Sequence, residues 1–200
     1  DSAEYEIAQV NRYYQRGGLI VTVVKEPSTK EIFIKPMTAP ALTTALSKYI
    51  AWEGYDGRSG GFVPKDPPVR IVSVIFDAEK YNHLPILNGI AQQPYLRDDH
   101  SLMCQRGYDE QSHIYGEFDP KDFHISAAPS KQEAAQALEK LKGLLDDFGF
   151  ASETDRAAAL AAILTAAIRP SLNLAPMFHV LAPMIGSGKS FLCELISLFA

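Results

Sequence analysis

A glycine-rich run near the end of the chain has the residue types and spacing to bind phosphate. Residues 182–190 read Ala-Pro-Met-Ile-Gly-Ser-Gly-Lys-Ser. The glycines let the backbone curl so that successive N–H groups can point at phosphate oxygens. The lysine can bring an ammonium group to the β- and γ-phosphates of ATP, and the final serine hydroxyl can bind Mg²⁺. The candidate nucleotide-binding residues are therefore Gly186, Ser187, Gly188, Lys189 and Ser190, with Lys189 also the candidate catalytic residue and Ser190 the candidate Mg²⁺ ligand.

The segments on either side of this run are expected to position it. Met177 to Leu181 is a short apolar run that favours a buried strand, and Phe191 to Phe199 favours a helix. A strand, a loop that ends in Gly-Lys-Ser and a helix is the context that a phosphate-binding loop requires. Pro183 stands where that pattern has its first glycine, and proline fixes φ and lacks an N–H group, so we interpret the loop as a variant. The alternative is a chance Gly-Ser-Gly-Lys-Ser at an ordinary strand–helix turn.

Other side chains form weaker patterns. No recognised zinc spacing relates His100, Cys104, His113 and His124. His179 lies within the predicted strand, where a core histidine with its hydrogen bonds satisfied is favoured over a general base. A cysteine or serine nucleophile with its base cannot be assembled from the sequence.

Basic residues are concentrated between Arg12 and Arg70, where nine Lys and Arg occur with five Asp and Glu, although the whole chain has a net charge of −5. The stretch could face phosphates, but an ordinary solvated face is favoured. Trp52, Tyr55 and Arg58 could stack on bases, but packing in the core or at its edge is favoured. The net charge does not by itself indicate nucleic acid.

Short strands and helices are expected over residues 1–125. The patterns predict, in order, a helix within 3–15, a hairpin of strands at 19–24 and 32–34, a helix that starts at Thr38, a loop over 55–68, a helix over 69–76 and several short strands over 84–118.

Helices are expected over residues 126–200. A capping box at Ser130 predicts a helix through about Asp147. A second capping signal at Ser152 predicts an alanine-rich helix to Ile168, which is apolar nearly all round and should be buried.

Together these patterns define the expected fold class. An α+β N-terminal region over 1–125 is followed, over 126–200, by a helical segment and the opening strand, loop and helix of an α/β P-loop NTPase domain.

Composition excludes several classes of protein. The chain has 46% hydrophobic residues, and its most apolar stretch, 157–168, is shorter than the roughly 20 residues that a membrane span needs, so no membrane partner is expected. A polar N-terminus without a signal peptide and two cysteines favour a soluble, cytoplasmic protein. The first residue is Asp1 rather than Met, and the last ten residues form an apolar helical stretch without a stop signal. The sequence is therefore expected to be a fragment.

A set of short motifs in a fixed order carries a family resemblance. They are Tyr14–Gly18, Asp66–Pro68, Leu87–Ile90, Pro94–Arg97, Gly107–Asp109, Asp155–Leu160, Arg169–Ser171 and 182–190. In this order they resemble the primase-helicase ATPases encoded by prophages and integrative elements. The middle segment is also similar, by analogy alone, to the linker that precedes the helicase domain in poxvirus-like primase-helicases.

The resemblance implies an ATP-driven motor on DNA, a ring-shaped homo-oligomer in the full-length protein, that acts in mobile-element or phage DNA replication. Only the five phosphate-loop residues carry over from the family. An acidic metal-holding residue, a sensor and an arginine finger would lie beyond Ala200, so the chain is expected to bind ATP and Mg²⁺ without hydrolysing ATP.

Two alternatives remain open at this point. Residues 1–125 could be a DNA-binding or protein-docking module to which the loop is incidental. A small phosphotransferase kinase also uses Gly-Lys-Ser, but such kinases usually place the loop near the N-terminus.

Overall fold

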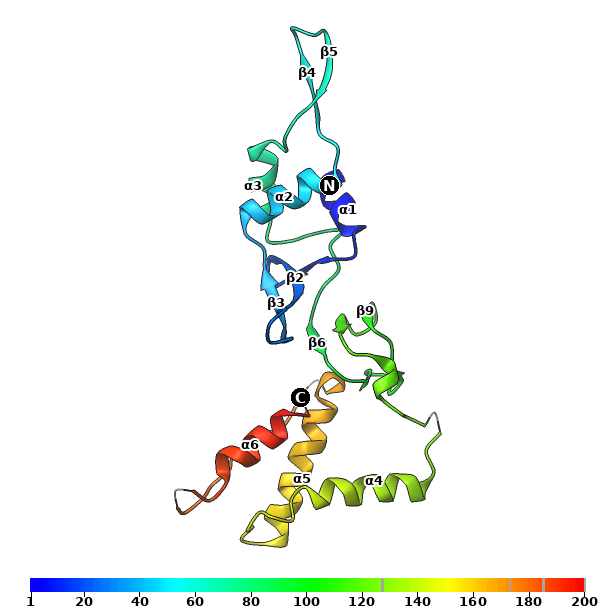
Figure 1. Cartoon of the computed structure of the whole chain (residues 1–200), viewed down its shortest axis with the longest axis vertical. Coiled ribbons are helices and arrows are strands. Elements are labelled where there is room, and N and C mark those ends of the chain that lie inside the picture. The colour runs from blue at the N-terminus through cyan, green and yellow to red at the C-terminus, as the bar shows by residue number, and fades with distance from the viewer. Residues whose placement is uncertain (127, 173, 185, 200) are drawn as a thin grey trace. The chain divides into compact units, whose positions relative to one another are not determined.

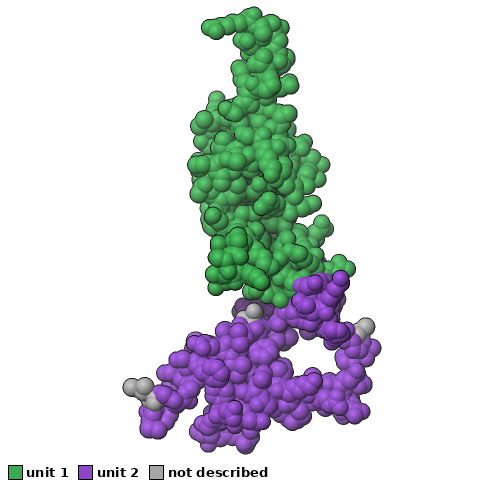
Figure 2. Space-filling view, in the orientation of Figure 1, with its two compact units in different colours: residues 1–92, 105–118 green, residues 93–104, 119–200 purple. Residues whose placement is uncertain are grey.

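The computed structural model describes residues 1–126, 128–172, 174–184 and 186–199. These residues fold as a mixed α+β protein with several small sheets and six α-helices (Figure 1). They divide into two units, which Figure 2 distinguishes by colour and which are described separately. Unit 1 consists of residues 1–92 and 105–118, and unit 2 of residues 93–104 and 119–200.

Unit 1 contains most of the strands. Its elements are α1 (Ser2–Ala8), β1 (Tyr13–Arg16), β2 (Leu19–Lys25), β3 (Ile32–Pro36), α2 (Ala39–Tyr49), β4 (Glu53–Asp56), β5 (Gly61–Pro64), α3 (Val69–Phe76), β6 (Gly89–Ala91), β9 (Gly107–Asp109) and β10 (Ile114–Gly116).

The first sheet is antiparallel in the order β1-β2-β3. Gly17 and Gly18 join β1 to β2 with φ of +55° and +77°, values that a tight hairpin turn requires at both central positions. The predicted helix within 3–15 is therefore wrong beyond Ala8, because these glycines turn one strand into the next instead of ending a helix. The predicted hairpin at 19–24 and 32–34 is confirmed as β2 and β3.

Three helices pack together in the main core of unit 1. The helix predicted to start at Thr38 is confirmed as α2, and the Thr38 hydroxyl accepts a hydrogen bond from the N–H of Ala41. The helix predicted over 69–76 is confirmed as α3. The buried core residues contributed by the helices include Ile7, Leu42, Leu46 and Val72.

The segment between α2 and α3 is a β-hairpin, so the loop predicted over 55–68 is wrong at 55–56 and 61–64, which are strand, and right at the turn 57–60 and at 65–68. At its tip the Asp56 carboxylate accepts hydrogen bonds from the N–H groups of Arg58 and Ser59 at 3.2 and 3.3 Å. This local hydrogen bonding closes the turn, and Gly60 supplies the residue with positive φ that follows. Of the glycines that suggested a loop, Gly57 and Gly60 lie in the turn of the hairpin and Gly61 is the first residue of β5.

The short strands predicted over 84–118 are confirmed. In unit 1 they form a sheet in the order β6-β10-β9, with β10 parallel to β6 and antiparallel to β9. A small core of Tyr14, Val21 and Leu87 lies beside Tyr108 and Tyr115 of this sheet.

Unit 2 is mainly helical. Its elements are β7 (Tyr95–Leu96), β8 (Leu102–Met103), η1 (Pro120–Asp122), α4 (Lys131–Gly143), α5 (Glu153–Ala167), η2 (Arg169–Ser171) and α6 (Lys189–Ser197). None of the helices among the described residues is long and apolar enough to span a membrane.

The capping signals of unit 2 are confirmed. Ser130 and Glu133 form the reciprocal capping box of α4, which ends at Gly143, four residues earlier than predicted. The Ser152 hydroxyl caps α5 by accepting a hydrogen bond from the N–H of Asp155 at 3.2 Å. The expectation that α5 is buried all round is wrong, because only one face of it is buried in the described structure and Leu164 is exposed.

Candidate nucleotide-binding loop

The predicted phosphate-binding residues lie at the start of α6. Gly186 and Gly188 have φ of +83° and +81°, in the left-handed region that favours glycine. Gly188 is the residue before the helix, and its carbonyl accepts the N–H of Leu192 at 2.9 Å. No side chain caps this end of α6 among the described residues, so the first-turn N–H groups have no side-chain acceptor there.

Two of the predicted side chains stand in the first turn of α6. Lys189 and Ser190 are its first two residues, and both are exposed, as is Ser187 in the loop. The N-terminus of a helix carries partial positive charge and unpaired donors. The structure therefore brings an ammonium group, two hydroxyls and helical N–H donors to one exposed end of α6. Ile185, within the predicted loop, lies outside the described residues.

Aromatic packing holds the loop against the rest of unit 2. The rings of Phe148 and Phe191 stack with centroids 5.8 Å apart and planes 19° from parallel. A Cβ atom at Gly188 would lie 3.6 Å from the Phe148 ring, an ordinary contact distance. Leu192 is buried against Leu145 and Ile163. Nothing in the sequence motif pointed to Phe148, because this contact joins segments about forty residues apart.

The strand predicted before the loop is wrong. Residues 176–182 form neither helix nor strand, and Met177 and Leu181 are 93% and 80% exposed. Pro176 and Pro183 flank the run and remove N–H donors at both ends, and no described strand pairs with it. His179 is exposed, so its interpretation as a core histidine is also wrong. The described structure thus has the loop and the helix of the predicted motif but lacks its strand.

The basic stretch of the sequence is spread over unit 1. The Lys48 ammonium lies 5.1 Å from the centroid of the Tyr49 ring. Hydrogen bonding from Lys48, helped by Arg12, lowers the pKa of the Tyr49 hydroxyl below its usual value. Lys25 instead pairs with Glu117 at 3.5 Å. Some of these cations therefore already have partners within unit 1.

The aromatic residues near that stretch divide into two environments. Trp52 is half-buried against the helical core, and its Nε1 donates to the carbonyl of Leu46 at 3.1 Å, which confirms the packing interpretation for this residue. Tyr55 is 62% exposed and packs edge-on against Phe62, which is 72% exposed. Packing in the core or at its edge is therefore wrong for Tyr55, which is not among the described residues that form the core cluster or pack against it.

The weaker pattern of His100, Cys104, His113 and His124 is divided between the two units, with His113 in unit 1 and the others in unit 2. His113 hydrogen-bonds the Tyr108 hydroxyl at 2.9 Å in unit 1. In the part of the chain that the structure describes, no three His, Cys, Asp or Glu residues gather as a metal site would require.

Comparisons of the chain with models of protein families, with curated proteins and with solved structures found no match in any of the three. The interpretation of the loop therefore rests on its own residues and geometry.

Proposed function

We propose that residues 186–190 bind the phosphates of ATP, and that the chain is the ATP-binding portion of a DNA-dependent ATPase or helicase. The observation that carries the proposal is the pair of left-handed glycines directly before a helix whose first two residues are an exposed Lys189 and Ser190. This arrangement supplies what phosphate recognition needs: a curled backbone, free helical N–H donors and a mobile cation.

Each residue of the loop has a defined task in this proposal. Gly186 and Gly188 allow the backbone to approach the phosphates without a Cβ atom. Lys189 pairs with the β- and γ-phosphate oxygens as a charged donor, the strong form of hydrogen bond. The Ser187 N–H group adds a neutral donor between the two glycines.

Mg²⁺ fits the same end of α6. The Ser190 hydroxyl is an exposed oxygen in the first turn, and Mg²⁺ prefers a few protein oxygens together with phosphate oxygens and water. When bound, the ion neutralises charge on the β- and γ-phosphates. Ser190 would hold it, and Lys189 would share the phosphate oxygens.

The remaining parts of the proposal rest on the resemblance of the sequence motifs. They are DNA as the partner, a homo-oligomeric ring in the full-length protein, a role in mobile-element or phage DNA replication, and a cytoplasmic location.

Equilibrium binding of a fluorescent ATP analogue with Mg²⁺ tests the loop assignment. Loss of a charged hydrogen bond, about 1.5–3 kcal/mol, predicts that Lys189→Ala weakens binding roughly 10- to 150-fold. Lys131→Ala is the matched control, because Lys131 is also exposed and is also the first residue of a helix in unit 2. Absence of binding by the unmodified chain, or equal weakening by both substitutions, contradicts the proposal.

A DNA-binding or protein-docking role of residues 1–125 is the second candidate function. The exposed Tyr55–Phe62 pair favours it, because large exposed aromatic side chains mark interaction surfaces. Binding of a short DNA duplex that weakens steeply with salt would favour the DNA form of this role.

A further inference from the structure

The β4–β5 hairpin presents an aromatic pair to solvent. Tyr55 and Phe62 lie directly opposite each other across the two strands, with ring centroids 5.9 Å apart. A two-stranded hairpin is at best marginally stable alone in water. This hairpin extends beyond α2 and α3 in unit 1 (Figure 1). Its two aromatic side chains are largely exposed, Tyr55 at 62% and Phe62 at 72%. Such a surface is typical of an element that packs against a partner.

The charges around the aromatic pair are mixed. Arg58 lies at the tip and Lys65 follows β5, while Glu53 and Asp56 lie on β4. A surface that binds nucleic acid carries an excess of cations, which attract the phosphates. Aromatic side chains and arginine among charges of both signs are typical of a protein interface. The hairpin chemistry therefore favours a protein partner.

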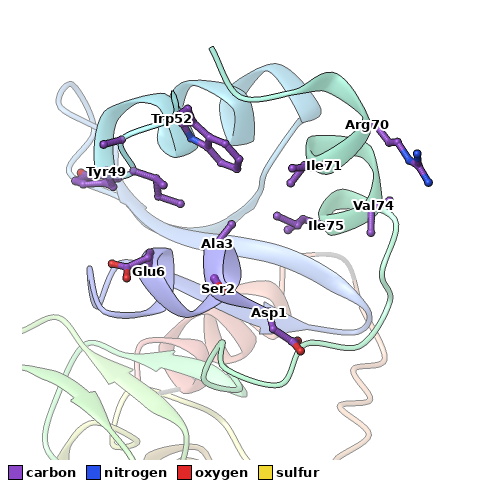
Figure 3. A pocket seen from close by; sticks show the side chains of 12 residues that line it. Asp1, Ser2, Ala3, Glu6, Tyr49, Trp52, Arg70, Ile71, Val74 and Ile75 are labelled. Carbon is purple, nitrogen blue, oxygen red and sulfur yellow. The ribbon is translucent and has the colours of Figure 1, made fainter. Parts of the chain in front are cut away.

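A groove in unit 1 has an apolar lining and charged borders, and so complements the aromatic and charged side chains of the hairpin. It lies between α1, α2 and α3 and has a volume of about 730 Å³ (Figure 3). Its apolar lining includes Trp52, Ile71 and Val74, and Val74 is 65% exposed. Glu6 of α1 and Arg70 of α3 lie at its two sides, so the groove has an acidic and a basic border.

The groove and the hairpin match in size and in charge. A cavity of about 300–1,000 Å³ holds a ligand of drug size, which is comparable to two aromatic side chains. Arg70 at one border complements Glu53 and Asp56, and Glu6 at the other complements Arg58. These pairs would set the orientation in which a hairpin enters.

The hairpin of the same chain does not fill this groove. β4 begins one residue after Trp52, which is itself part of the groove lining. The hairpin then leads away from the three helices (Figure 1). Each strand has four residues, or roughly 13 Å at 3.3 Å per residue, and both would have to reverse to return.

We propose that the occupant of the groove is the β4–β5 hairpin of a second copy of this chain. Tyr55 and Phe62 enter between α1, α2 and α3 of the neighbour, and the bordering charges pair across the contact. Each chain offers one hairpin and one groove, so two chains can exchange hairpins reciprocally, or successive chains can associate head to tail. This contact does not depend on the nucleotide loop in unit 2.

Sedimentation equilibrium of the unmodified chain and of single variants tests the proposal. Phe62→Ser removes one of the two aromatic rings of the hairpin, and Val74→Glu places a negative charge in the groove. Self-association of the unmodified chain is expected, and each of these variants should weaken it roughly tenfold or more, as truncation of a residue at the centre of an interface does. Phe33→Ser, at an exposed position on β3 of the same unit, is a control expected to leave it unchanged. Circular dichroism verifies that each variant is folded.

A mixture of the two variants gives the sharper result. A Phe62→Ser chain keeps its groove and a Val74→Glu chain keeps its hairpin, so the mixture should associate more tightly than either variant alone. Three results would overturn the proposal. The unmodified chain could remain monomeric at a concentration of about 100 μM, the mixture could associate no more tightly than either variant alone, or a control substitution could weaken association as much as the two variants do. A Phe62→Ser chain that loses oligonucleotide binding with unchanged self-association would also overturn it. Lys189→Ala should leave the association intact, which separates this test from that of ATP binding.

Discussion

Substitution of Gly188 tests the conformation that the nucleotide proposal requires. Gly188 has φ +81°, and a non-glycine residue in the left-handed region costs about 1–2 kcal/mol. Alanine also restricts the unfolded chain, which offsets about 0.4–1 kcal/mol of that cost. A Cβ atom would meet the Phe148 ring at 3.6 Å without a clash, so the backbone term dominates. Gly188→Ala should therefore destabilise unit 2 by about 1 kcal/mol.

The assay is urea denaturation followed by circular dichroism, which reports the helices of both units, α4, α5 and α6 of unit 2 among them. Gly188→Asn should cost less than Gly188→Ala, because asparagine tolerates the left-handed region better than other non-glycine residues. Gly186→Ala should cost about as much as Gly188→Ala, since φ is +83° there and no atom lies within 4 Å of the added Cβ.

The control is Gly143→Ala at the end of α4, where φ is not positive and the added Cβ meets only the Asp146 carboxylate at 3.9 Å. This substitution should be neutral or stabilising by up to about 1 kcal/mol. If Gly188→Ala and Gly143→Ala change stability by the same amount, the left-handed turn before α6 is refuted.

Two further predictions concern unit 1. The buried carboxylate of Glu4 accepts hydrogen bonds from the N–H groups of His83 and Leu84, so Glu4→Ala should destabilise unit 1 by about 1–3 kcal/mol. Denaturation followed by the fluorescence of the single tryptophan measures this loss. Glu4→Gln keeps an acceptor and should cost less, so equal losses from the two substitutions would contradict this role. Burial raises the pKa of Tyr14 and of Tyr108 to about 12, so the folded state holds these protons more tightly than the unfolded chain, and the free energy of unfolding should fall as pH rises from about 10 to 12. Tyr14→Phe should make that fall shallower in denaturation series at several pH values, and an unchanged slope would show that Tyr14 does not contribute.

Local signals in the sequence predicted many of the helix starts. Thr38, Ser130 and Ser152 each cap a helix where expected, because a capping hydroxyl acts on N–H groups within three residues of it. The β2–β3 hairpin was equally local. These features depend on residues that are close in the sequence, so the sequence pattern is sufficient to predict them.

The wrong secondary-structure predictions fall where one sequence pattern is compatible with two structures, or where residues distant in the sequence determine which structure forms. Glycines at 17–18 and 57–61 indicated an end of helix and a loop, whereas both segments are hairpin turns whose strands pair across them. The apolar run at Met177–Leu181 has the composition of a strand, but a strand forms only with a partner to accept its hydrogen bonds. The sequence could not show whether such a partner exists.

For the candidate site, the motif located the glycines, Lys189 and Ser190 at the start of a helix, and the structure has them there. It could not reveal the stacking of Phe148 on Phe191, which fixes the helix beneath the loop. Whether the loop binds ATP stays a prediction.

The interleaving of the two units along the chain has a consequence for cutting it. Residues 93–104 belong to unit 2 although unit 1 resumes at residue 105, and the Gln93 side chain donates to the carbonyl of Phe199 at 2.9 Å. A protease nick between residues 119 and 126 would therefore sever the backbone without dividing the molecule into its two units. A fragment that ends at residue 125 would likewise carry β7 and β8 away from the helical segments they belong with. Excising unit 1 cleanly calls for replacing 93–104 with a short linker and ending the chain at 118.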